Sequence, residues 1–316
     1  METSPFRKKR PRSSPTPSGK RTAITDNDIF GIFEPLSRHA HLTTKQIVAF
    51  DRRCNSKTRN RLTDLYHGER KWLERLSEKL KFANSLFVDE MYRLGEDAEE
   101  LLALRGIVPS DDWVQATRIG GNSTAPSRIL RLAHDHMASQ IALDIEIGAR
   151  GAPDVRFRNH VEIIGTSPAR TQAFPNPLNV AVPSIADAPQ WIEPDALFAI
   201  NDRFFALEAD MGTESIEAVI KPKIKAYREI VASAAIDRHF GVHGLSLRVL
   251  FVTTNEKRMR NMMRAVESIA KNGRSTMFCF ACRSDLGQFT RAPAPDGRMF
   301  RDPWRRAGEN DVFLRS

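Results

Sequence analysis

The stretch 191–227 carries three carboxylates at the ends of two expected strands. Asp195 opens an apolar run that reaches Ile200, turn residues follow at 201–203, and a second apolar run leads into Glu208 and Asp210. Two runs of strand length around a polar turn predict a β-hairpin. Since alternate side chains of a strand point to one face, we expect Glu208 and Asp210 to project together, near Asp195.

These three carboxylates have the chemistry of a metal site. Mg²⁺ and Mn²⁺ prefer oxygen ligands and are commonly held by one or two carboxylates together with water and substrate phosphate. We therefore predict Asp195, Glu208 and Asp210 as ligands of Mg²⁺ or Mn²⁺ and as catalytic residues of a hydrolytic site. The alternative is that Glu208 and Asp210 only form salt bridges with the basic helix that follows.

The motifs in this stretch resemble a known family. In order, they are Pro194-Asp195, then Glu208-x-Asp210-x-Gly212-Thr213, then Lys223 and Tyr227 four residues apart on a helix. This series is similar to the C-terminal signature of the replication-relaxation proteins, and the resemblance extends over about 40–285. These are prokaryotic proteins, commonly borne by plasmids or mobile elements. The resemblance implies an α+β chain with an N-terminal winged helix-turn-helix, followed by an α/β restriction-endonuclease-like domain with a central mixed sheet.

One departure from the nuclease pattern concerns the catalytic lysine. The superfamily pattern ends in Asp/Glu-x-Lys, and Asp210 occupies the position of that lysine here. A lysine on the next helix can substitute for it, and we predict Lys223, which shares a helical face with Tyr227, as the group that activates water or stabilises phosphate. A solvated or DNA-facing basic face is the alternative. For the carboxylate on the first helix of that fold, Asp144 and Glu146 are candidates.

The N-terminal part of the chain follows the order of a winged helix. A short helix over 45–50, capped by Thr43 or Thr44, precedes a second helix that Ser56 caps. Leu62, Leu65 and Tyr66 form the buried stripe of that second helix. Strands within 71–76 and 86–94 are joined by a wing, and a helix over 97–104 closes the unit. A protein-docking module is the alternative. The residues predicted to contact DNA are Lys57, Arg59, Asn60 and Arg61 of the second helix and Lys79 and Lys81 of the wing.

The rest of the chain is divided by composition and period. The expected divisions are a disordered basic arm 1–27, the winged helix 28–108, a linker 109–126, the nuclease-like domain 127–290 and an irregular tail 291–316. Within the nuclease-like domain we expect helices over 127–150 and 257–270 and strands over 155–157, 161–164, 247–254 and 276–282. In the first of these helices, His134 and His136 point about 200° apart, so His134 is interpreted as a core histidine.

Composition restricts the partners. The net charge is +9 and the pI about 9.7, which favours a polyanion such as nucleic acid. Seven of the basic residues lie in 1–22, against Glu2 alone, and four of them are predicted DNA contacts: Arg7, Lys8, Lys9 and Arg10. A solubilising tail is the alternative for this arm. No apolar run has the length of a membrane span, and three cysteines fit a reducing compartment, so we expect a cytoplasmic protein without membrane partners.

Three functions remain open from the sequence. The favoured one is a DNA-binding accessory protein of plasmid or mobile-element replication, relaxation or mobilisation, with double-stranded DNA and other replication or mobilisation proteins as partners. The second is an active metal-dependent endonuclease or nickase. The third is a winged-helix transcriptional regulator whose C-terminal domain only dimerises. The acidic cluster favours the second over the third, and the displaced lysine favours the first over the second.

Overall fold

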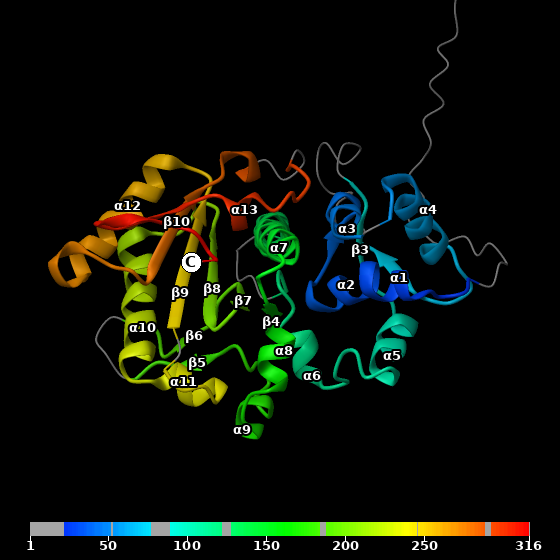
Figure 1. Ribbon diagram of the computed structural model, residues 1–316, viewed down its shortest axis with the longest axis horizontal. Coiled ribbons are helices and arrows are strands. Elements are labelled where there is room, and N and C mark those ends of the chain that lie inside the picture. The colour runs from blue at the N-terminus through cyan, green and yellow to red at the C-terminus, as the bar shows by residue number, and fades with distance from the viewer. Residues whose placement is uncertain are drawn as a thin grey trace, which may run out of the picture.

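The protein combines helices with a central mixed sheet (Figure 1). The computed structural model describes residues 22–51, 53–76, 89–121, 128–183, 188–244, 246–287 and 292–315. A small helical unit with a three-stranded sheet occupies one end of the molecule, and a seven-stranded sheet with helices on both faces occupies the other. The expectation of a mixed α+β fold with a central mixed sheet is therefore confirmed.

The N-terminal unit alternates short helices and strands. Its elements are α1 Asp26–Asp28, a π-helical turn Ile29–Phe33, α2 Glu34–Arg38, β1 Leu42–Thr43, α3 Thr44–Phe50, α4 Asn55–Tyr66, β2 Leu73–Arg75, β3 Met91–Leu94 and α5 Glu96–Leu104. The strands pair in the order β1-β3-β2, antiparallel throughout. Thr43 caps α3 through a capping box with Gln46, as expected. The chain is ordered from before position 28, since Thr25 caps α1 in the same way.

Two details of α4 differ from expectation. The helix begins at Asn55 with Cys54 as its N-cap, so Ser56 lies inside the first turn and does not cap it. Thr58, which lies among the residues predicted to contact DNA, is fully buried, and its hydroxyl donates to Asp51 Oδ2 at 2.9 Å. The buried stripe of Leu62, Leu65 and Tyr66 is confirmed.

The segment expected to be a linker packs against its neighbours over its described part. It contains α6, Asp112–Ala116, in which the side chains of Trp113 and Val114 are buried. Farther on, Ile119 pairs with His39 in a short parallel bridge. The segment is polar and rich in Gly and Pro, but it still packs against the rest of the protein. Burial of two apolar residues, Trp113 and Val114, attaches the single turn of α6.

The long helix α7, Arg128–Arg150, covers one face of the central sheet. The sheet has the order β12-β11-β10-β9-β8-β7-β4, and β8, β9 and β10 are parallel. Its strands are β4 Phe157–Asn159, β7 Ala196–Ile200, β8 Arg203–Asp210, β9 Ser246–Thr253, β10 Phe278–Cys282, β11 Trp304–Arg306 and β12 Glu309–Val312. The hairpin β7–β8 confirms the expected turn near Asn201.

Alternate residues of β8 pack into two different cores. Phe204 and Ala206 face the helices α10, Lys221–Ala232, and α12, Glu256–Ile269, whereas Phe205 and Leu207 face α7. In Figure 1, α7 lies on one side of the sheet and α10 and α12 lie on the other. A strand covered on both faces accounts for the continuous apolar runs of the sequence.

The second strand-like piece of the sequence is a helix. Residues 161–164 lie in α8, His160–Gly165, and the observed strand β4 shares only Phe157 with the first expected piece, 155–157. Asn159 caps α8 in a capping box with Glu162. The apolar run 161–164 is too short for its period to distinguish a strand from a helix, and the capping box stabilises the helix.

The expectation of an irregular C-terminal tail is wrong. The segment forms α13, Arg298–Arg301, and the edge strands β11 and β12 of the central sheet. Trp304 is 1% exposed, and its indole nitrogen donates to the Met299 carbonyl. Asp144 of α7 accepts backbone N–H bonds from 296, 297 and 299, so it fastens this segment to the sheet.

The remaining elements cover the edges of the sheet. They are α9 Ala169–Gln172, β5 Val180–Ala181, β6 Trp191–Ile192 and α11 Ala235–Phe240, with β5 and β6 forming a two-stranded sheet. None of the helices in the described ranges is both long and apolar enough to cross a bilayer.

Candidate functional site

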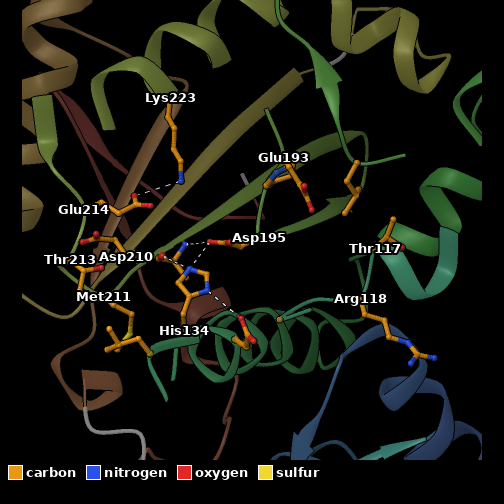
Figure 2. A pocket seen from close by; sticks show the side chains of 16 residues that line it. Thr117, Arg118, His134, Glu193, Asp195, Asp210, Met211, Thr213, Glu214 and Lys223 are labelled. Carbon is orange, nitrogen blue, oxygen red and sulfur yellow. Dashed lines mark hydrogen bonds and ion pairs between the residues drawn. The ribbon is translucent and has the colours of Figure 1, made fainter. Parts of the chain in front are cut away.

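The predicted site residues gather at the carboxyl end of β8. Asp195 immediately precedes β7, and Glu208 and Asp210 are the last polar positions of the adjacent strand. A cavity of about 480 Å³ opens here, bordered by α7, the β8 end, the loop 211–214 and α10 (Figure 2). Among the residues that line it are the polar side chains Thr117, Arg118, His134, Asp135, Glu193, Asp195, Asp210, Thr213, Glu214 and Lys223.

Asp195 is bound to α7 through His134. Its Oδ2 accepts the Ala209 N–H at 2.7 Å and lies 3.5 Å from His134 Nε2, and Figure 2 shows the imidazole directed at this carboxylate. The other ring nitrogen, Nδ1, faces Asp135 at 3.6 Å, and Nε2 also lies 3.1 Å from the Ala209 carbonyl. Acceptors on both sides of the ring favour the doubly protonated imidazolium.

This environment shifts the titration of the pair. Burial disfavours the charged imidazole, but the contacts with Asp135 and Asp195 outweigh burial and raise the pKa of His134 to about 10. For Asp195 burial acts in the opposite direction, and the charge and hydrogen bond of His134 hold its pKa below the ordinary value. Asp195 and His134 are therefore a carboxylate–imidazolium pair at neutral pH.

Glu208 is held by α10. It is 3% exposed, its Oε2 accepts from Lys223 Nζ at 2.9 Å, and its Oε1 accepts from the Tyr227 hydroxyl at 2.5 Å. Burial raises the pKa of Glu208, although both partners act against that rise. Burial also disfavours the Lys223 ammonium, yet the charge of Glu208 outweighs it and raises the pKa of Lys223. The pKa of Tyr227 is raised well above its usual value by burial and by Glu208, so the phenol remains a donor.

Asp210 is held by α12. Arg258 donates to it through two nitrogens, from Nε to Oδ2 at 2.5 Å and from Nη2 to Oδ1 at 2.7 Å, in the bidentate geometry that arginine forms with carboxylates. The same Nη2 donates to the Glu214 carbonyl at 2.7 Å. This arginine thereby links β8 to the loop that borders the cavity.

Each predicted metal ligand therefore already has a cationic partner from a different helix. Asp195 is paired from α7, whereas Glu208 and Asp210 are paired from α10 and α12, on the other face of the sheet. In the part of the chain that the structure describes, no group of three or more His, Cys, Asp or Glu side chains is arranged to hold a metal ion. An Mg²⁺ or Mn²⁺ ion would have to displace these internal cations, and its binding stays a prediction.

Several site residues were assigned other roles, or none, from the sequence. His134 was interpreted as a core histidine, but it is 22% exposed at the side chain and lines the cavity. Arg258 was assigned no role, since nothing in its spacing connects it with Asp210, 48 positions earlier. Asp144 and Glu146 both lie away from the cavity lining, because Glu146 pairs with Arg38 at 2.8 Å and Asp144 binds the C-terminal segment.

The predicted DNA contacts on α4 divide into two groups. Lys57, Arg59 and Asn60 are exposed on its surface. Arg61 is instead held by Asp28, with Nη2 at 2.6 Å from Oδ2 and Nε at 2.9 Å from Oδ1, so it stabilises the attachment of α1 to α4. The other predicted contacts, Arg7, Lys8, Lys9, Arg10, Lys79 and Lys81, lie outside the described residues.

Comparison with known families agrees with the motif order. A family model described as Replication-relaxation matches residues 33–245, a range that includes α4 and all the predicted catalytic residues. The chain belongs to the replication-relaxation family. Membership associates it with replication or relaxation of plasmids or mobile elements. Searches among curated proteins and among solved structures give no match.

Proposed function

We propose that this replication-relaxation protein is a DNA-binding accessory factor of plasmid or mobile-element replication, relaxation or mobilisation. In this proposal the N-terminal unit is a winged helix that attaches the protein to double-stranded DNA. The nuclease-like domain around the central sheet then acts on, or holds, the DNA delivered to its cavity, together with other replication or mobilisation proteins.

The observation that carries this proposal is the two-sided character of α4. One face of the helix packs Leu62 and Leu65 into the core, while Lys57 and Arg59 point to solvent near its N-terminal end. The preceding helix α3 and the sheet β1-β3-β2 support this proposal, since winged helices have a similar element order and insert the second helix of the motif into the major groove. Exposed basic side chains at that end are placed to contact phosphates and base edges.

The test is a pair of matched double variants. Lys57→Ala with Arg59→Ala should weaken duplex binding and lower the slope of log affinity against log salt by about 0.9 for each phosphate that is no longer bound. Arg260→Ala with Arg264→Ala removes the same charge from exposed positions of α12, at the opposite end of the molecule from α4 (Figure 1), and should leave the slope unchanged. Arg61 is left intact, since its loss would also remove the Asp28 pair. Equal slopes for the two variants would exclude α4 as the DNA-binding element.

A metal-dependent endonuclease is the second candidate, and the position of Lys223 favours it. This lysine lines the cavity together with Asp195 and Asp210 and binds Glu208, although it comes from the helix after the strand. In the nuclease pattern a lysine at the position of Asp210 lies beside the carboxylates, and Lys223 would take over its role from α10. Because its ammonium is strongly stabilised, its role in such a reaction would be to stabilise phosphate charge rather than to accept a proton.

Supercoiled plasmid with Mg²⁺ or Mn²⁺ separates the two candidates. An endonuclease converts the plasmid into nicked circles or linear DNA, and Glu208→Gln or Lys223→Met should abolish that conversion. An accessory factor binds the plasmid and leaves its topology unchanged. Nicking that persists in both variants would indicate a contaminating nuclease or a different active site.

A further inference from the structure

A second hollow adjoins the carboxylate cavity. It is a groove of about 930 Å³ lined by β6 and α10, with Ser268 and Ile269 of α12 also in its lining. Glu193 and Lys223 line both the groove and the cavity, so the two hollows are adjacent at these residues. A polymer lying in the groove would pass close to the carboxylate cavity.

One wall of the groove carries an exposed aromatic side chain. Trp191 of β6 is 48% exposed, and next to it lies Phe174, 39% exposed, with ring centroids 6.2 Å apart. Single exposed apolar residues are ordinary, but two neighbouring large rings beside a groove are not. The other three tryptophans, Trp72, Trp113 and Trp304, are buried, and all four lie in the described part of the chain.

The facing wall carries three lysines and one glutamate, Glu217. Lys221 and Lys225 line the groove from α10, and their spacing of four places them on one side of the helix. Lys221 binds the exposed Glu217 at 2.6 Å, a surface pair that contributes little and that a phosphate could replace. Aromatic rings opposite lysines are the combination by which proteins hold single-stranded nucleic acid, with bases stacked on the rings and phosphates on the cations.

We propose that this groove binds a single strand of DNA and leads it into the carboxylate cavity. The bases of a duplex are stacked within the helix and cannot lie on Trp191, whereas an unpaired strand exposes them. The inference rests on the proposed function and adds its substrate: α4 binds the duplex, and the groove holds a strand separated from it.

The test measures binding of a labelled oligothymidylate by anisotropy, using the full chain. Trp191→Ala should weaken binding roughly five- to 150-fold, the range found for removing one stacking residue, and Trp191→Phe should retain most of it. Phe313→Ala removes a ring of similar exposure, 44%, from the segment after β12, and should have no effect. Unlabelled strand should also quench tryptophan emission, because the one exposed tryptophan is the one that stacks.

Duplex binding by the same variants distinguishes this inference from the proposed function. We expect Trp191→Ala to bind duplex normally and the α4 variant to retain single-strand binding. If the wild type binds duplex but not the single strand, or if Trp191→Ala binds the strand as tightly as the wild type, the groove is not a strand site and the α4 proposal stands. If the wild type binds neither, both proposals fail.

Discussion

Replacing Arg258 tests whether the acidic site depends on its internal cations. Arg258 is 16% exposed at the side chain and supplies two short hydrogen bonds to Asp210, which is 3% exposed. In Arg258→Gln the Asp210 carboxylate remains buried without its cation. Removing one partner of a buried pair typically costs about 3–5 kcal/mol. Since the Arg258 end of this pair is partly solvated, we expect a loss of about 3 kcal/mol in the free energy of unfolding.

Urea denaturation followed by circular dichroism measures this loss. The control is Arg260→Gln on the same helix, whose side chain is 60% exposed and pairs only with surface Glu256. The free energy of unfolding of this control variant should stay within about 0.5 kcal/mol of the wild-type value. The double variant Asp210→Asn with Arg258→Gln removes both charges and should be more stable than Arg258→Gln alone; measured with the single variant Asp210→Asn, it completes the cycle that gives the coupling energy of the pair. A single variant as stable as the wild type, or a double variant no better than the single, would refute the view that Arg258 neutralises Asp210.

Three further predictions concern other parts of the chain. The pKa of His134 is about 10 in the folded state and near 6.5 in the unfolded state, so its contribution to stability is complete below about pH 6.5 and is lost as the pH rises toward 10. Denaturation at several pH values should show a smaller fall in stability over this window for His134→Gln than for the wild type. Deleting residues 1–21, which carry seven basic side chains, should leave the thermal midpoint nearly unchanged and reduce non-specific DNA affinity in a salt-dependent way; a large loss of stability would contradict the predicted disorder of the arm. Cys54, exposed and with its pKa lowered by the Ser56 hydroxyl, should react first with a thiol reagent, whereas burial raises the pKa of Cys279 to about 11 and should make it the slowest; mass spectrometry of partly labelled protein identifies the order.

The elements with a clear period were predictable from the sequence. The hairpin β7–β8, the strand β9 and the helices α7 and α12 agree with expectation within a few residues, because each has an apolar pattern of one dominant period. Short apolar runs were not predictable in this way. The run 161–164 contains β-branched residues typical of a strand, and the side chains of Asn159 and Glu162 decide in favour of a helix.

The C-terminal strands were not predicted from the sequence, for a different reason. β11 and β12 are short and polar, and they carry few of the apolar residues that mark a strand. They form because β10 presents an open edge and because Trp304 anchors the segment in the core. Such long-range pairing is a tertiary effect that local propensity does not encode.

The sequence indicated which residue types form the acidic site, but not which cation pairs with each carboxylate. Spacing correctly placed Glu208 and Asp210 on one face of β8 and Lys223 on the helix beside them. It could not show that one cation arrives from α7, 61 positions before its carboxylate, and another from α12, 48 positions after. The alternative, in which Glu208 and Asp210 both pair with the following basic helix, holds for Glu208, which binds Lys223 of α10, but not for Asp210, which binds Arg258 of α12.

The arrangement of these pairs has a consequence for any ligand of the cavity. The three carboxylates that would hold a divalent ion are each bound to a helix, so their charges also fasten α7, α10 and α12 to the end of the sheet. A cation that binds these carboxylates must displace the cations that already pair with them. An anionic ligand would instead approach Lys223 and His134 while these remain beside Glu208 and Asp195. A DNA phosphate is of the second kind. The internal ion pairs therefore oppose capture of a bare cation, which favours the accessory-factor proposal over the endonuclease.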